Sequence, residues 1–205
     1  MTARLPGPRT RLVTGCAGLA LTALMVRQDR VGRRETRVFR AVNDLPDSLF
    51  VPAWVVMQLG NLAAAPAAAG AALAARERRM ARRLLVGGTA SWALSKVVKK
   101  GIRRPRPALL LPDAHRRGQD ATGLGYLSGH TAVAVALGAA ALPRLHGPAR
   151  AAVLTAIPVV GLCRIYVGAH LPLDIVGGAC MGLAIEAAVA IAQEGGERPG
   201  ANPTG

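Results

Sequence analysis

Long stretches of apolar residues, separated by short charged connections, run through almost the whole chain. The clearest of them carries no charge from Leu49 to Ala75 and is long enough to cross the roughly 30 Å hydrocarbon core of a bilayer. Others, such as Leu84–Ser95 and Ala151–Cys163, reach the roughly 20 residues of a span only if the cations at their ends are included. The pattern predicts six membrane segments, at about 12–27, 49–75, 82–99, 130–146, 150–168 and 173–192.

The connections between these segments predict an orientation. Residues 76–83 form a short loop with five arginines and one glutamate, which the positive-inside rule keeps in the cytoplasm. The N-terminus and the C-terminal tail then lie on the same side, and the 28–48 and 100–127 connections lie outside. The arginines of 28–48 would invert this topology if they counted as cytoplasmic. Acidic residues dilute them, however, and an amphipathic helix on the membrane surface would accommodate them.

The expected fold class is therefore all-α, a polytopic membrane bundle of about six transmembrane helices. We expect one domain over residues 1–193 and a disordered tail over 194–205, which contains Gly, Pro and Asn. The chain has 205 residues, of which 51% are hydrophobic and only 3% aromatic. This bias toward Ala, Leu, Val and Gly is typical of helices that pack closely in a bilayer, although a soluble helical bundle could share it.

The charge and the cysteines restrict the partners. A net charge of +15 could serve nucleic acid, anionic lipid headgroups or an anionic substrate. The 26 Lys and Arg residues lie almost entirely between the apolar stretches, with no basic surface interleaved with aromatic residues, so we expect membrane lipids and no nucleic acid. Cys16, Cys163 and Cys180 have neither a paired framework nor a zinc spacing, so no disulfide, metal or other cofactor is expected.

Three polar motifs follow one another in the second half of the chain. They are KKGIRRPRP at residues 99–107, YLSGHT at 126–131 and CRIYVGAHLPLD at 163–174. In a bundle of six antiparallel helices, the connection between the third and fourth helices and the one between the fifth and sixth emerge on the same side. All three motifs should therefore meet at one membrane surface.

The residue types in these motifs suit a phosphate group. A phosphate dianion needs several fixed cations, and arginine can bind it in bidentate fashion. A Ser-Gly-His sequence at a helix start offers unpaired N–H groups at the positive end of the helix dipole, and its glycine allows close approach of the backbone. The candidate phosphate-binding residues are Lys99, Arg106, Ser128, Gly129 and Arg164.

Two histidines and one aspartate remain as candidate catalytic groups. His170 and Asp174 are four residues apart, and Pro172 between them suits the first turn of the sixth helix. Asp174 would then accept a hydrogen bond from His170 Nδ1, which fixes the tautomer and leaves Nε2 free as a nucleophile. His130 remains as the general acid for the leaving oxygen.

Together the three motifs resemble the signature of the type 2 phosphatidic acid phosphatase family of lipid phosphate phosphatases, K-x6-R-P, P-S-G-H and S-R-x5-H-x3-D. The resemblance implies that His170 is the phosphate-accepting nucleophile, Asp174 its orienting partner and His130 the leaving-group acid, without a metal. Two positions depart from the signature: Leu127 replaces Pro and Cys163 replaces Ser. The first removes a fixed φ and the second a good hydrogen-bond donor, while every acid, base and cation remains.

The resemblance implies hydrolysis of a lipid phosphate or diphosphate, such as an isoprenoid diphosphate or phosphatidic acid, through a phosphohistidine intermediate. The alternatives are a membrane phosphotransferase with the same site and a catalytically decayed lipid-binding protein. Vanadium-dependent haloperoxidases use a similar pocket but are soluble, and this chain is too apolar for that. The predicted topology places the site on the extracytoplasmic face of the cell membrane; the sequence says nothing of the oligomeric state.

Some charged residues outside the signature have structural interpretations. Arg103 and Arg104 are expected as anchors to lipid headgroups. Arg116 and Arg117 are expected in a solvated loop, with contact to the substrate as the alternative. Glu186 lies inside the last apolar segment, where an ionisable residue is costly unless it is paired. We expect it to pair with another helix or to lie near the membrane interface opposite the motifs.

Overall fold

The computed structural model describes residues 5–27, 31–118 and 123–195, and within these ranges every regular element is helical. The predicted tail lies almost entirely beyond residue 195, outside the described residues. The α-helices are α1 (Pro8–Val26), α2 (Arg33–Asn43), α3 (Phe50–Met57), α4 (Ala64–Ala74), α5 (Arg78–Ile102), α6 (Pro107–Leu110), α7 (Gly129–Ala141), α8 (Gly147–Tyr166) and α9 (Pro172–Gly195). Short 3-10 turns are η1 (Asp47–Leu49), η2 (Gln58–Gly60) and η3 (Leu142–Arg144).

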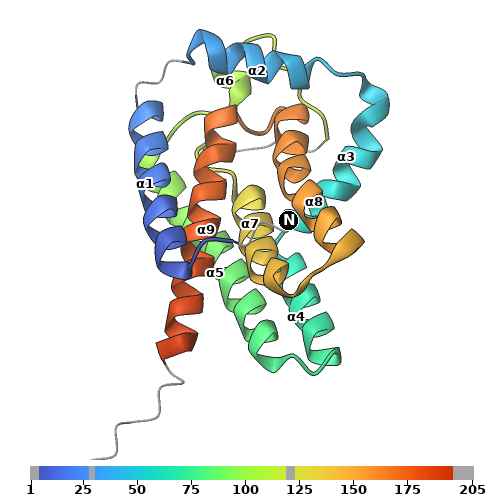
Figure 1. Cartoon of the computed structure of the whole chain (residues 1–205). Helices are drawn as coiled ribbons and strands as arrows, with labels where there is room; N and C mark the ends of the chain where they lie inside the picture. The colour runs from blue at the N-terminus through green and yellow to red at the C-terminus, as the bar shows by residue number, and fades with distance from the viewer. Residues whose placement is uncertain (1–4, 28–30, 119–122, 196–205) are drawn as a thin grey trace, which may run out of the picture.

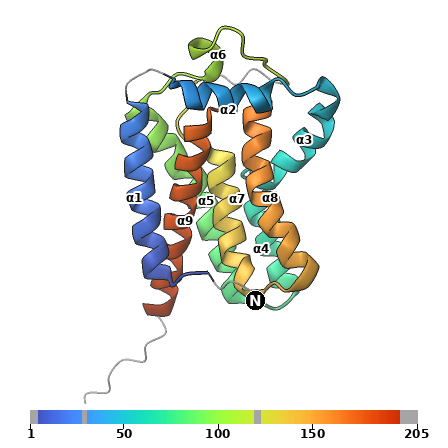
Figure 2. The ribbon, with the colours of Figure 1, turned by 45° about the horizontal axis from the view of Figure 1, so that its top comes forward.

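The long helices run side by side along one axis (Figures 1 and 2). Helix α7 lies in the middle, packed against α5, α8 and α9, and α1 lies on the outer side of α9. Helices α2 and α6 lie at one end of the bundle, and the first turn of α1 and the last turn of α9 lie at the other. This arrangement is the antiparallel bundle that the sequence predicts.

Helices α8 and α9 are each long and apolar enough to cross a membrane, and the bent pair formed by 47–60 and 64–74 passes the same test if it counts as one span. Helices α1, α5 and α7 do not pass the test themselves but lie alongside these segments in the bundle (Figure 2). Each of the six predicted segments thus corresponds to helices of the bundle, and the expected fold class is confirmed.

The second predicted segment, 49–75, is not one continuous span. It breaks after Gly60, and the pieces before and after the break differ in direction by 66°. Asn61 is extended, and its Oδ1 accepts a 2.9 Å hydrogen bond from the backbone N–H of Ala64 at the start of α4. A Cβ on Gly60 would collide with the carbonyl of His130, so the break is a turn pressed against the first turn of α7. It brings α3 beside the second motif.

Glycines at the helix interfaces allow the helices to pack closely. A Cβ on Gly15 of α1 would lie 2.8 Å from the backbone nitrogen of Ala184 on α9. On the other side of α9, a Cβ on Gly182 would collide with the backbone of Ala132 in α7. Such close contacts give van der Waals packing between helices that have no hydrophobic driving force in lipid.

Glu186 of α9 is fully buried at the end of the bundle away from the motifs and pairs with two arginines. It accepts a 2.9 Å hydrogen bond from Arg11 Nη2 on α1 and a 2.8 Å hydrogen bond from Arg83 Nε on α5. The expectation that Glu186 pairs with another helix is confirmed. Its contacts tie three helices together.

Candidate active site

The first motif begins in the last turn of α5 and continues into the following loop. α5 ends where Arg103 adopts a left-handed backbone conformation, with φ of 59°. Lys99 Nζ donates to the carbonyl of Gly125 at 2.9 Å and to that of the preceding residue at 3.1 Å. Arg106 Nη1 donates to the carbonyl of Ala169 at 2.8 Å. Lys99 and Arg106 therefore contact the loops that lead to the other two motifs.

The second motif forms the N-terminus of α7. Ser128 caps the helix: its Oγ accepts from the Thr131 hydroxyl at 3.0 Å and, over a longer 3.4 Å, from the Thr131 backbone N–H. A Cβ on Gly129 would lie 2.9 Å from Ser95 Oγ, so a glycine here also lets α5 pack closely. The backbone N–H of Ser128 donates to the carbonyl of Asp174 at 2.9 Å, which joins the second motif to the third.

The third motif spans the end of α8, a tight turn and the start of α9. Arg164 is in the last turn of α8, and its carbonyl accepts from the backbone N–H groups of Ala169 (3.1 Å) and His170 (3.2 Å). The Arg164 side chain reaches α3, where Nη1 lies 3.3 Å from Met57 Sδ. His170 and Asp174 are both buried, and Asp174 is in the first turn of α9. The guanidinium of Arg164 and the imidazole of His170 thus lie at the two ends of one tight turn.

The imidazole of His170 faces the carboxylate of Asp174, with Nδ1 3.5 Å from Oδ2. That distance is longer than a hydrogen bond, and Nδ1 has no hydrogen-bond partner among the described residues. Asp174 Oδ2 accepts a 2.9 Å hydrogen bond from the backbone N–H of Leu171, and Oδ1 accepts one of 2.8 Å from Arg104 Nη1. The expected pairing is present as a close approach, and the carboxylate is already held by two other donors.

The environment of His170 keeps it neutral. Its side chain lies in the turn between α8 and α9, where burial lowers its pKa well below the ordinary value. The positive charges of Lys99 and Arg164 lower this pKa further. A histidine in this environment carries no charge at neutral pH, which is the form required of a nucleophile.

A pocket of about 870 Å³ opens beside the motifs. Its polar wall contains Arg106, Arg164 and His130 from the motifs and Arg116 from the loop after α6. The expectation of a solvated loop is therefore incomplete for Arg116, whose exposed side chain lines the pocket. His170 is buried next to Ala169, which lines the pocket. A bound anion would meet several cations and one accessible histidine.

Another part of the pocket lining is apolar. It is made by Phe50, Trp54 and Met57 of α3 and by Leu109 of α6. The sequence does not predict these residues as pocket lining, because the uncharged stretch 49–75 has the pattern of one continuous span. The signal was present in the polar Gln-Leu-Gly-Asn sequence at residues 58–61, which interrupts the apolar stretch at the bend.

Arg104 is a buried member of the site, and its interpretation as a headgroup anchor is wrong. It donates to both carboxylate oxygens of Glu35 on α2, at 2.7 and 3.1 Å, and to Asp174 at 2.8 Å. Burial alone would lower its pKa, but the hydrogen bond from Arg104 to Glu35 and the charges of Asp174 and Glu35 raise the pKa of Arg104 above its ordinary value. The sequence carries no signal for this role, since Arg103 and Arg104 are adjacent and alike.

Arg117 lines the same pocket and is held in place by structural contacts, so the expectation of a solvated loop is wrong for it. Its side chain is 10% exposed and donates to Asp47 Oδ1 at 2.7 Å and to the carbonyl of Asn43 at 2.7 Å. Its guanidinium lies over the ring of Tyr166, 4.3 Å from the centroid. These contacts attach the loop before α7 to α8 and to the segment after α2.

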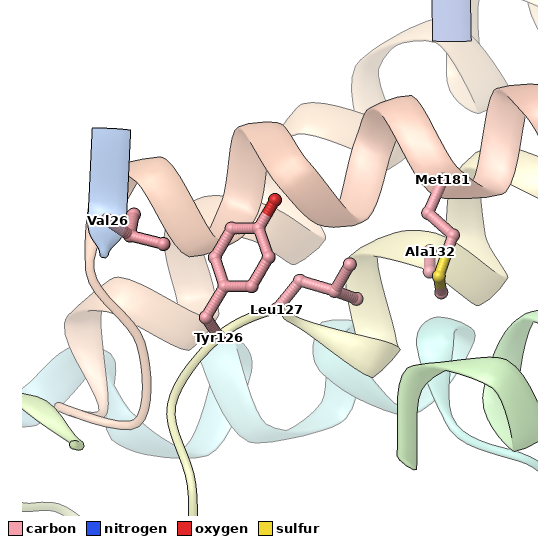
Figure 3. Close-up of a cluster of buried hydrophobic side chains, with 5 residues drawn as sticks. All are labelled: Val26, Tyr126, Leu127, Ala132 and Met181. Atoms are coloured by element: carbon pink, nitrogen blue, oxygen red, sulfur yellow. The ribbon is translucent and has the colours of Figure 1, made fainter. Parts of the chain in front are cut away.

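The two departures from the signature are both buried. Leu127 is in an apolar cluster with Tyr126, Val26, Ala132 and Met181, drawn from α1, α7, α9 and the loop before α7 (Figure 3). The replacement of Pro by Leu therefore adds to the core.

Cys163 similarly packs against Met57 and Tyr166. All three cysteines are free thiols. In the part of the chain that the structure describes, no group of three or more His, Cys, Asp and Glu side chains is placed to hold a metal ion.

Two solved structures have the same architecture. The crystal structure of LpxE from Aquifex aeolicus matches with a TM-score of 0.67 and 23% identity, over 76% of this chain and 94% of that one. The first transmembrane PAP2 type phosphatidylglycerolphosphate phosphatase from Bacillus subtilis matches with a TM-score of 0.64 and 20% identity, over 90% of this chain and 98% of that one. At these identities the likeness establishes a common fold. No curated protein matches this chain in sequence.

The fold and the three motifs define a membrane protein with a basic pocket at one end of a helical bundle. Residues 81–195, more than half of the chain, match the PAP2 superfamily, and all three motifs lie within this range. The chain belongs to the PAP2 superfamily. The resemblance recognised from the motifs is thereby confirmed.

Proposed function

We propose that this protein is a membrane phosphatase that hydrolyses a lipid phosphate or diphosphate through a phosphohistidine intermediate, without a metal. The observation that carries the proposal is the buried His170, which faces Asp174 and lies beside a pocket whose lining includes Arg106, Arg164 and His130. The residues proposed to bind the phosphate are Lys99, Arg106, Ser128, Gly129 and Arg164.

The first chemical step transfers the phosphoryl group to His170. Nε2 attacks phosphorus, the bond from phosphorus to the lipid oxygen breaks, and His130 gives its proton to that oxygen. The negative charge of the bound phosphate favours the protonated form of His130 that this step needs. The imidazole gains positive charge as the P–N bond forms, and Asp174 stabilises this charge through Nδ1–H. The approach of 3.5 Å in the free protein would shorten to a hydrogen bond at that stage.

The second step returns the protein to its starting state. A water molecule attacks phosphorus, and His130, now neutral, takes the proton from this water. The P–N bond breaks, inorganic phosphate leaves with the oxygen of the water, and His170 is again neutral. The arginines of the pocket stabilise the charge on the phosphoryl oxygens in both steps.

The apolar wall supports a lipid as the substrate. Phe50, Trp54, Met57 and Leu109 face the same pocket as the arginines, so an apolar chain can lie beside a bound phosphate. One structural neighbour is named as a phosphatidylglycerolphosphate phosphatase, which acts on a lipid phosphate. Phosphatidic acid, an isoprenoid diphosphate and phosphatidylglycerol phosphate are the candidates. We further propose that residues 1–193 form one membrane domain with its active site on the extracytoplasmic face.

The test is phosphate release by the purified full chain in detergent from a panel of these lipids, with His170→Ala as the control. We expect release from at least one lipid by the native protein alone. A parallel reaction with an added alcohol distinguishes a phosphotransferase, because the phosphoryl group then appears on the alcohol instead of in free phosphate. No turnover of any lipid in either reaction would leave the decayed, lipid-binding protein as the better description.

A further inference from the structure

Helix α2 faces the bundle with three residues spaced four apart, Glu35, Phe39 and Asn43, all of them buried. Phe39 packs in an apolar cluster, and Asn43 donates to the carbonyls of His115 and Tyr166, each at 2.9 Å. Phe39 and Asn43 thus account for the docking of α2. The carboxylate of Glu35 on this buried face is unexpected, because a buried charge is costly unless it is paired.

Glu35 is paired with the side chain that holds Asp174. Its Oε2 accepts from Arg104 Nη2 at 2.7 Å, and its Oε1 accepts from Arg104 Nη1 at 3.1 Å and from the backbone N–H of Leu173 at 3.0 Å. Arg104 Nη1 also donates to Asp174 Oδ1 at 2.8 Å. A bidentate pair of this kind fixes the plane of the guanidinium, so the direction in which Nη1 points at Asp174 is set by Glu35.

Arg104 determines both the charge and the orientation of Asp174. Asp174 is fully buried, where a carboxylate is stable as an anion only with a compensating cation. With Oδ1 held by Arg104 and Oδ2 held by the N–H of Leu171, the carboxylate cannot rotate away from His170. The contacts form a continuous series from the end surface of the bundle, through Glu35, to the imidazole.

We propose that Glu35 and Arg104 are positioning residues that hold Asp174 ionised and directed at His170, which rests on the proposed role of His170. Neither residue is part of the pocket lining. They act through Asp174, whose negative charge favours the tautomer with the proton on Nδ1. The surface helix α2 therefore supplies a residue to the active site, although it lies far before the signature in sequence.

The kinetic test compares Glu35→Gln with Asn43→Ala, which removes a buried polar residue from the same face of α2. Glu35→Gln keeps the size of the side chain but removes its charge and leaves Arg104 without its bidentate partner. We expect kcat to fall about a hundredfold, as for a misplaced catalytic group, with KM nearly unchanged because the pocket cations stay in place. We expect Asn43→Ala to lower the melting temperature while kcat per folded molecule stays near that of the native protein.

A second measurement does not depend on turnover. The protein has four histidines, so ¹⁵N-histidine labelling in detergent, with His170→Asn for assignment, resolves the ring nitrogens of His170. We expect the Nδ1–H tautomer in the native protein and a shift toward Nε2–H in Glu35→Gln. An unchanged tautomer in Glu35→Gln would overturn the proposal, as would equal losses of kcat in both variants. If the native protein cleaves no lipid phosphate, the proposed function fails, and the tautomer alone decides on the positioning role.

Discussion

The backbone N–H of Ser128 donates a 2.9 Å hydrogen bond to the carbonyl oxygen of Asp174. This bond joins the first turn of α7 to the first turn of α9, and hence the helix that carries His130 to the helix that carries the partner of His170. The first N–H groups of a helix have no partner within that helix. Here the N–H at the start of α7 donates to a carbonyl in the first turn of α9. The relative position of the two candidate catalytic histidines therefore depends on how closely α7 and α9 pack.

Gly178→Ala should disturb this packing. A Cβ on Gly178 would collide with the Ser128 carbonyl and lie 3.3 Å from Thr131 Cβ, so α9 must move away from α7. Overpacking of this kind costs about 1–3 kcal/mol, and we expect kcat to fall more than this loss of stability alone would explain. Gly87→Ala is the matched control, since nothing lies within 4 Å of its Cβ, and thermal unfolding in detergent with activity per folded molecule compares the two.

His170→Ala should abolish turnover and the trapping of labelled phosphate on the protein. Among the described residues, His170 is the one histidine whose ring lies within 4 Å of a buried carboxylate, and the variant keeps the pocket cations. The measurement is incubation with a lipid carrying labelled phosphate, followed by an alkaline quench that preserves phosphohistidine. Label that remains on the variant protein, or full turnover by it, would contradict the mechanism.

Activity should persist in excess EDTA and be inhibited by vanadate. Vanadate adopts the five-coordinate geometry of the attacked phosphorus, and such analogues bind about a hundredfold or more tighter than substrates. The inhibition should weaken in Arg164→Gln, which removes one cation from the pocket. Loss of activity on chelation, with recovery on adding back one metal, would mean that the metal-free reaction is wrong.

The candidate site should be accessible from outside the cell. Residues 76–83, which carry five arginines, are mostly the first turns of α5 and not the loop that the sequence predicts. They are still expected at the cytoplasmic face, which directs α5 outward and delivers Lys99 to the outer face. In a variant without the native cysteines, Asp113→Cys should react with an impermeant thiol reagent in intact cells, since the side chain of Asp113 is 81% exposed in the loop after α6. Ala149→Cys, exposed at the start of α8, should react only after permeabilisation. The reverse pattern would invert the topology.

Glu186→Leu should destabilise the protein without affecting the active site. It leaves Arg11 and Arg83 without their carboxylate inside the bundle, and breaking a buried ion pair in this way costs about 3–5 kcal/mol. Thermal unfolding should show this loss, while kcat of the remaining folded protein stays near that of the native chain. Replacing both arginines by Met in the same protein should recover most of the stability, because no unpaired charge is then buried.

The amino-acid sequence was sufficient for the order of the helices, the membrane class and the three motifs. Helix positions follow from apolar stretches bounded by charge, and the spacing within each motif is local, so neither depends on distant contacts. The pairing of Glu186 was also predictable, since an isolated charge within an apolar helix is too costly to remain unpaired.

Contacts between distant segments needed the tertiary structure. The bend after Gly60 depends on the backbone of His130, seventy residues later, and it creates the apolar wall of the pocket.

Glu35 and Arg104 are likewise ordinary charged residues in the sequence, and only the docking of α2 buries them against Asp174. The residue types and their spacing thus determined by themselves which chemistry the motifs can perform, because these are properties of single side chains and of local backbone. The shape of the pocket and the neighbours of Asp174 depend on which helix faces meet, and that was decided only when the whole chain packed.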